Sequence, residues 1–94
     1  MTVEHKLYIG ANNQTGEVEV DKAIEIVGRF FAGFTVQESI GIWHGKREKS
    51  IVVTVVANEH SWSDIDNCVR SLTEELHQDF VLRTSQMVSS NLGI

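Results

Sequence analysis

The sequence predicts an α+β domain in which a four-stranded antiparallel sheet is covered by two helices on one face only. Three observations lead to this prediction. Two segments carry apolar residues at helical spacing, and four others alternate in polarity or are rich in β-branched residues. These segments follow one another in the order β-α-β-β-α-β. The chain has 94 residues, which is the length of one domain.

The first half of the chain predicts a strand, a loop and a helix. Residues 6–10 alternate and predict a short strand, and the polar residues 11–17 predict a loop. A helix is expected from Val20, with a stop at Gly33, because glycine accepts the left-handed conformation just past a helix end. The apolar face of this helix comprises Val20, Ala23, Ile24, Val27, Phe30 and Phe31.

A β-hairpin is expected in the middle of the chain. Residues 34–43 alternate and predict a half-buried strand that is interrupted at Glu38. Residues 44–50 predict a charged turn. Residues 51–57 are almost all β-branched and are apolar on both faces, which is typical of a central strand.

The last segments complete the fold. Ser61 and Asp64 resemble a capping box, so a second helix is expected from here to about His77. A final strand over residues 80–88 and a loose tail over residues 89–94 follow. Right-handed crossovers place the first and third strands in the centre of the sheet. The prediction for residues 1–94 is therefore a single domain with the ferredoxin-like βαββαβ fold.

The charge and the termini exclude several classes of function. A net charge of −5 argues against nucleic-acid binding and against an anionic membrane surface. No apolar run approaches the roughly 18 residues of a membrane helix, and the N-terminus has no signal-peptide pattern. We therefore expect a cytoplasmic protein. Three of the eight Lys and Arg residues gather in one segment, as Lys46, Arg47 and Lys49.

No catalytic or metal-binding motif stands out. Cys68 is the only cysteine, and the four His residues lack metal-ligand spacing. None of the His residues is expected at a clearly inward strand position beside another polar group. A triad of His60, Ser61 and Asp64 is rejected because Ser61 is expected to cap a helix. We expect no metal, no cofactor and no catalytic residue.

The uncovered face of the sheet is a candidate interface. Strand parity predicts that Tyr8, Trp43, Val52 and Val56 point outward and form an apolar patch. Trp43, Val52 and Val56 are the interface residues that we expect, with Trp43 as the dominant one. The predicted partner is a second copy of this chain, in a closed homo-oligomer.

Two polar loops are candidate ligand sites. The loop after the first strand can offer backbone amides and Asn side chains, and the cationic hairpin can hold a phosphate beside an aromatic ring. The candidate ligand-binding residues are Tyr8, Asn12, Asn13, Thr15, Trp43, His44, Lys46 and Arg47. An ordinary turn and a solvated hairpin tip remain open as the alternatives.

The hairpin from Gly41 to Glu48, together with the short chain, the absence of proline and the single cysteine, resembles small phage-encoded proteins of ferredoxin-like fold. This resemblance implies a protein that acts on host defence, by sequestering a nucleotide signal or by blocking another protein. It assigns no catalytic residue.

Three functions are therefore carried forward. The first is a non-enzymatic, homo-oligomeric module that captures a small anionic, nucleotide-like ligand. The second is a protein–protein inhibitor or adaptor that acts through the open sheet face. The third is a dimeric ferredoxin-like enzyme without a cofactor, which a buried His facing a cavity would favour.

Overall fold

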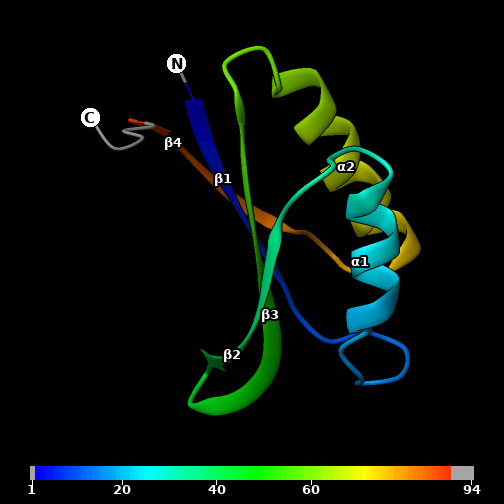
Figure 1. The fold of residues 1–94 in the computed structure, drawn as a ribbon. Helices are drawn as coiled ribbons and strands as arrows, with labels where there is room; N and C mark the ends of the chain where they lie inside the picture. Colours follow the sequence, from blue (N-terminus) through cyan, green and yellow to red (C-terminus); the bar gives the residue numbers. More distant parts are fainter. Residues whose placement is uncertain (1, 90–94) are drawn as a thin grey trace.

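Six elements follow one another in the expected order. The computed structural model describes residues 2–89, so most of the expected tail lies outside the described residues (Figure 1). The elements are β1 (Thr2–Ile9), α1 (Val20–Gly28), β2 (Thr35–Trp43), β3 (Lys46–Asn58), α2 (Trp62–Glu75) and β4 (Leu82–Val88).

The four strands form one sheet in the order β2-β3-β1-β4, and every neighbouring pair is antiparallel. Both helices lie on the same side of this sheet (Figure 1). The first and third strands are central, as the sequence predicts. The protein therefore has the ferredoxin-like α+β fold.

The core lies between the sheet and the two helices. Leu7 of β1, Val53 of β3, Ile26 of α1 and Leu72 of α2 are all fully buried. Each such side chain contributes about 1.5–3 kcal/mol by leaving water. Cys68 is buried in the same cluster, as expected of a small apolar residue.

The packed face of α1 differs from the predicted one. Ala23, Ile26 and Val27 are its buried residues, whereas Ile24 is exposed. At about 100° per residue, Ile24 lies a quarter-turn away from Ala23, so the assignment of Ile24 to the packed face was wrong. The helix also ends at Gly28, before the expected stop at Gly33.

The central hairpin is longer and more regular than predicted. Its turn consists of His44 and Gly45 alone, with φ values of 50° and 77°, and the residues from Lys46 onward belong to β3. The expected interruption at Glu38 is absent, because Glu38 pairs with Ile51 within the ladder. The charged segment is therefore a strand and not a turn.

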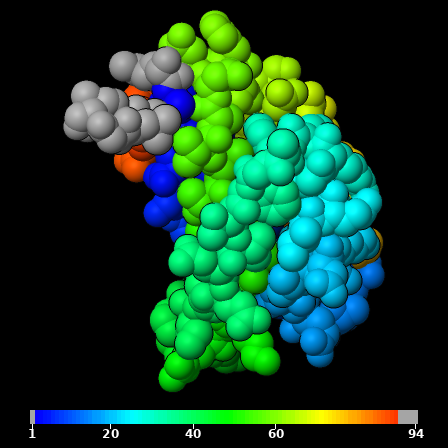
Figure 2. All heavy atoms as spheres, in the orientation of Figure 1, coloured from blue at the N-terminus to red at the C-terminus, as the bar shows by residue number. Residues whose placement is uncertain are grey.

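The end of this hairpin extends beyond the rest of the sheet. The strand β1 ends at Ile9, opposite Ile51, so residues 39–50 continue as two strands without a third. We call residues 39–50 the hairpin arm. Figure 2 shows it projecting past the helices at one end of the molecule. Three large apolar side chains on the arm are exposed, namely Ile40 (58%), Ile42 (65%) and Trp43 (64%).

Within residues 2–89, no helix has the length and apolar character that crossing a membrane requires.

Candidate functional site

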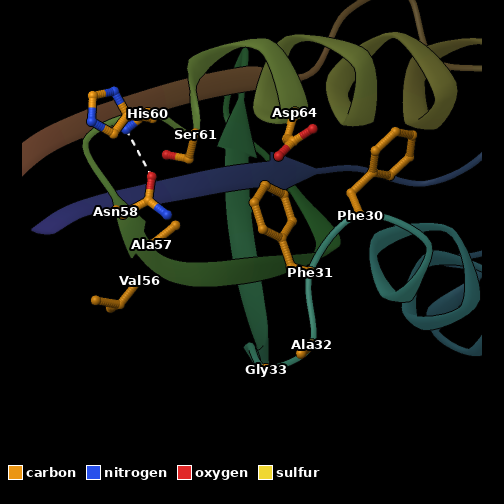
Figure 3. A pocket seen from close by; sticks show the side chains of 10 residues that line it. All are labelled: Phe30, Phe31, Ala32, Gly33, Val56, Ala57, Asn58, His60, Ser61 and Asp64. Atoms are coloured by element: carbon orange, nitrogen blue, oxygen red, sulfur yellow. Dashed lines mark hydrogen bonds between the residues drawn. The ribbon is translucent and has the colours of Figure 1, made fainter.

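A pocket of about 400 Å³ opens beside the end of β3, as Figure 3 shows from close by. The hairpin arm is at the other end of β3. Three segments line it: the turn after α1, the end of β3 and the start of α2. The lining residues are Phe30, Phe31, Ala32, Gly33, Val56, Ala57, Asn58, His60, Ser61 and Asp64. We call this space the α2 pocket.

The lining combines an aromatic wall with a polar one. Phe30 and Phe31 come from the turn after α1, and Figure 3 shows Phe31 and Asp64 pointing toward one another from different segments. The Asn58 side-chain oxygen accepts a hydrogen bond from the backbone N–H of His60 at 2.8 Å. Asp64 is the only carboxylate among the ten lining residues, and there is no Lys or Arg among them.

Behind the pocket, His5 is fully buried on the helix-covered face of β1. Its Nε2 lies 3.0 Å from the Ser61 hydroxyl, and its Nδ1 lies 2.7 Å from the Ser85 hydroxyl. The ring also packs edge-on against Trp62, with 5.1 Å between the ring centroids. A neutral imidazole can satisfy both hydroxyls, because one of its nitrogens donates and the other accepts.

The surroundings of His5 favour this neutral form. Burial lowers its pKa, and the positive charge of Arg83 lowers it further, whereas Asp66 opposes both effects. Arg83 and Asp66 form an ion pair with each other. The imidazole is therefore a neutral hydrogen-bonding group near pH 7.

Ser61 precedes the first residue of α2, but its side chain does not cap the helix. The structure contains no side-chain cap hydrogen bond there, so the predicted capping box was wrong. The Ser61 hydroxyl turns to the imidazole of His5 instead. The backbone N–H groups of the first turn of α2 lack a side-chain cap, and they carry the positive end of the helix dipole at the pocket.

The role of His5 was missed because the first strand was expected to begin at Lys6. It begins at Thr2, and Val3, His5 and Leu7 alternate on its buried face. The expectation that no His occupies an inward strand position beside another polar group was therefore wrong. The alternation of residues 3–9 is the signal that could have identified it.

The loop after β1 is held together by its own side chains. Asn12 is buried, and its side-chain oxygen accepts from the backbone N–H groups of Gln14 and Thr15, at 2.7 Å and 3.2 Å. This arrangement is the Asx turn that gives such loops their shape. Asn13 and Thr15 are exposed, and the backbone N–H of Asn13 donates to the carbonyl of His77. A ligand-binding role for Asn12 stays a prediction, and it would require these bonds to break.

The strand register separates the cationic residues of the hairpin. Trp43 pairs with Lys46 on the open face, whereas Arg47 pairs with Ile42 on the opposite face. The His44 ring lies edge-on to Trp43, with 4.7 Å between centroids. Within one chain, Trp43 and Arg47 therefore cannot hold the same small ligand between them. No hydrogen bond among the described residues joins the hairpin arm to the loop at Asn12.

The predicted apolar patch on the open face is divided. Tyr8 pairs with Val52, as the parity predicts, and Val52 pairs on its other side with Gln37 of β2. Trp43 is six residues further along β2 than Gln37, which places it about 20 Å from this row of three residues. A row containing Thr54 lies between Val52 and Val56. The roles of Trp43, Val52 and Val56 in an interface, and the docking of another protein on this face, stay predictions.

Within residues 2–89, no group of three or more His, Cys, Asp or Glu side chains has an arrangement that could hold a metal ion.

Comparisons with known proteins identify the fold and no family. No family model matches the sequence, and no curated protein matches it. One similar solved structure is a DUF3240 family protein from Shewanella baltica. The match covers 100% of this chain and 98% of that protein, with a TM-score of 0.69 at 9% identity. A phage SAM lyase in its apo state is similar over 89% of this chain and 78% of its own, with a TM-score of 0.50 at 19% identity. A de novo design, Foldit4, is similar over 94% of this chain and 97% of its own, with a TM-score of 0.50 at 13% identity.

Proposed function

We propose that the protein binds a small nucleoside-containing molecule in the α2 pocket. The observation that carries this proposal is one concave space of about 400 Å³ with two phenylalanines on one side and hydrogen-bonding groups on the other. Sites for small ligands commonly have volumes of roughly 300–1,000 Å³ and combine apolar walls with a few polar groups.

The chemistry of the lining suits a nucleoside. The rings of Phe30 and Phe31 offer stacking surfaces for a base, whose flat face binds aromatic side chains regardless of its identity. The side-chain amide of Asn58 can donate a hydrogen bond while its oxygen is held by His60. The carboxylate of Asp64 can accept from ribose hydroxyl groups.

The charge of the pocket favours a neutral or positively charged ligand over the anionic one that the sequence predicts. Asp64 repels an anion, and the lining contains no Lys or Arg to balance it. S-adenosylmethionine joins an adenosine to a positive sulfonium centre, and a positive centre can rest on an aromatic face beside a carboxylate. The similar fold of a phage SAM lyase makes this compound the first to test. An anionic nucleotide would need cations from outside the pocket.

Calorimetry with a panel of ligands tests the proposal. The panel comprises S-adenosylmethionine, adenosine, ATP and cyclic mono- and dinucleotides. We expect at least one to bind, and Phe31→Ala to weaken that binding at least tenfold because the stacking surface is lost. Phe80→Ala, which removes an exposed phenylalanine outside the pocket, is the matched control and should bind normally. The absence of heat for every compound, at protein concentrations well above micromolar, would end the proposal.

A second candidate is an enzyme that uses the same pocket without a cofactor. The specific observation that favours it is the hydrogen bond between the buried His5 and Ser61, because Ser61 lines the pocket. A neutral imidazole at 3.0 Å can accept a proton from this hydroxyl as a general base. Incubation of the panel with the protein, followed by mass spectrometry, distinguishes the candidates, since a binding module returns every compound unchanged.

A further inference from the structure

The hairpin arm is a sparsely covered part of the described structure. A two-stranded hairpin is marginally stable in water by itself, and this one exposes Ile40, Ile42 and Trp43, with no helix or third strand from residues 2–89 paired beside it. Ile40 and Ile42 lie on one face of the arm and Trp43 on the other, so both faces of the arm present large apolar side chains to solvent. The arm therefore has the character of an element that packs against a partner.

The charge of the arm is opposite to that of the rest of the chain. The arm holds three of the eight Lys and Arg residues, Lys46, Arg47 and Lys49, but only one of the thirteen acidic residues. None of these three cations forms an ion pair within residues 2–89. A surface complementary to the arm is therefore acidic. The part of this chain outside residues 39–50 is acidic, because it holds twelve of the thirteen Asp and Glu residues.

The α2 pocket has the features that such an arm would meet. Its lining has one carboxylate, Asp64, and no Lys or Arg, and a second carboxylate, Glu59, lies in the sequence between the lining residues Asn58 and His60. Val56, which also lines the pocket, is 57% exposed and offers an apolar contact for the arm. The pocket is therefore complementary to the arm in charge and in apolar character.

The arm of one chain cannot reach the pocket of the same chain. Lys46 and Asn58 are the two ends of β3, and a strand of this length separates them by about 40 Å at about 3.3 Å per residue. Only the arm of another copy can meet the pocket. A contact of this kind, between two different surfaces, is heterologous and closes into a ring when the rotation between copies allows it.

We propose that the hairpin arm of a second copy packs over the α2 pocket through one of its faces, with Lys46 near Asp64 and Trp43 against Val56, or with Arg47 near Asp64 and Ile42 against Val56. This inference rests on the proposed function, because the arm would complete the ligand site. It gives that site the positive charge that its own lining lacks, and it allows an anionic nucleotide to bind where one chain alone would repel it. The partner is this same chain.

Charge exchange between the two surfaces tests the proposal. Native mass spectrometry and light scattering are applied to the full chain at about 50 mM and about 500 mM salt. We expect an oligomer that weakens as salt increases. The double variant Lys46→Glu/Arg47→Glu and the variant Asp64→Lys should each weaken association at least tenfold. Lys22→Glu/Arg70→Glu changes two exposed cations outside both surfaces and should associate like the wild type.

Mixing the two weakened variants is the decisive step. Each retains one unaltered surface, so a heterologous contact restores association in the mixture, and the triple variant Lys46→Glu/Arg47→Glu/Asp64→Lys should associate by itself. A wild type that is monomeric at about 100 µM, or an oligomer that survives both changes, overturns the inference. Neither outcome affects the calorimetry of the wild type, so the inference and the proposed function can fail separately.

Discussion

The imidazole Nε2 of His5 lies 3.0 Å from the hydroxyl of Ser61, although the two residues are 56 positions apart in the chain. This bond connects a central strand to the first turn of α2 at the wall of the pocket. The other ring nitrogen reaches Ser85 on the edge strand β4. One side chain therefore links three elements, and the geometry of the pocket depends on it.

Replacement of His5 by Leu should destabilise the protein by about 1–3 kcal/mol. Leu fills a similar volume, but it leaves the buried Ser61 hydroxyl without a partner, and an unsatisfied buried polar group costs this much. Urea denaturation monitored by circular dichroism measures the change. Ser85→Ala removes the partner of the other ring nitrogen and should cost less, because Ser85 is exposed and water can replace its hydroxyl at Nδ1 of His5. Equal stability of wild type and His5→Leu would contradict the assigned role.

The stability of the wild type should fall as the solution becomes more acidic than about pH 6.5. The pKa of His5 is lowered in the folded state, so the unfolded state binds its proton first, and protonation favours unfolding. The stabilisation that the neutral His5 gives to the folded state is fully present above the ordinary pKa of 6.5. It is lost as the pH decreases toward the lower pKa that His5 has in the folded state. Each unit of lowering corresponds to about 1.4 kcal/mol.

Denaturation midpoints between about pH 5 and pH 8 measure this dependence. The variant His5→Leu is the control, since it removes the titrating group and should have a flatter profile. If the two profiles coincide, another group causes the acid sensitivity of the wild type.

Much of the fold could be predicted because the spacing of apolar residues along the sequence reflects which side chains are buried in each helix and strand. The β-branched run of residues 51–57 identified a central strand, and helical spacing identified both helices. The ends of elements were predicted less well. Because Glu38 and Lys46 are polar, the sequence predicted a strand interruption at Glu38 and a turn at Lys46. Both residues belong to strands, because backbone pairing in the long hairpin requires no apolar side chain.

The pocket could not be predicted from local patterns. Its wall combines Phe31, Asn58 and Asp64, whose proximity depends on how the end of α1 packs beside the end of β3. The contact between His5 and Ser61 likewise joins segments that are distant in the sequence. Spacing along the chain carries no information about such contacts, whereas the motif at Ser61 suggested a local cap that the hydroxyl does not form.

The turn of the hairpin should respond to substitution at its two positive φ positions. His44→Asn should leave stability equal or slightly higher, because asparagine adopts the left-handed conformation more readily than histidine does. Gly45→Ala should cost about 1–2 kcal/mol from the backbone alone, since a methyl group there meets no atom within 4 Å. Thermal denaturation compares the two. A Gly45→Ala variant as stable as the wild type would mean that the turn has another conformation.

The thiol of Cys68 should be inert in the folded protein. It is buried in the core, and burial raises its pKa to about 11, so about one molecule in a thousand carries a thiolate at about pH 8. We expect the reaction with a disulfide reagent to be at least about a hundredfold slower in buffer than in urea, where the chain is unfolded. Rapid reaction in buffer would indicate that α2 opens readily from the sheet.

Asp64→Asn should change which ligands the α2 pocket accepts. Asp64 is the only carboxylate in the lining and is exposed, so in a dielectric close to that of water it is worth about 1 kcal/mol to a unit ligand charge about 4 Å away. In a chain without a second copy's arm over the pocket, its removal should weaken a positively charged ligand such as S-adenosylmethionine about five- to tenfold, leave adenosine unchanged and strengthen ATP. Calorimetry with these three compounds measures the order. Asp79→Asn removes an exposed carboxylate outside the lining and should leave all three affinities as they are. A uniform loss for all three compounds in Asp64→Asn would show that this residue holds the shape of the pocket and does not select the charge of its ligand.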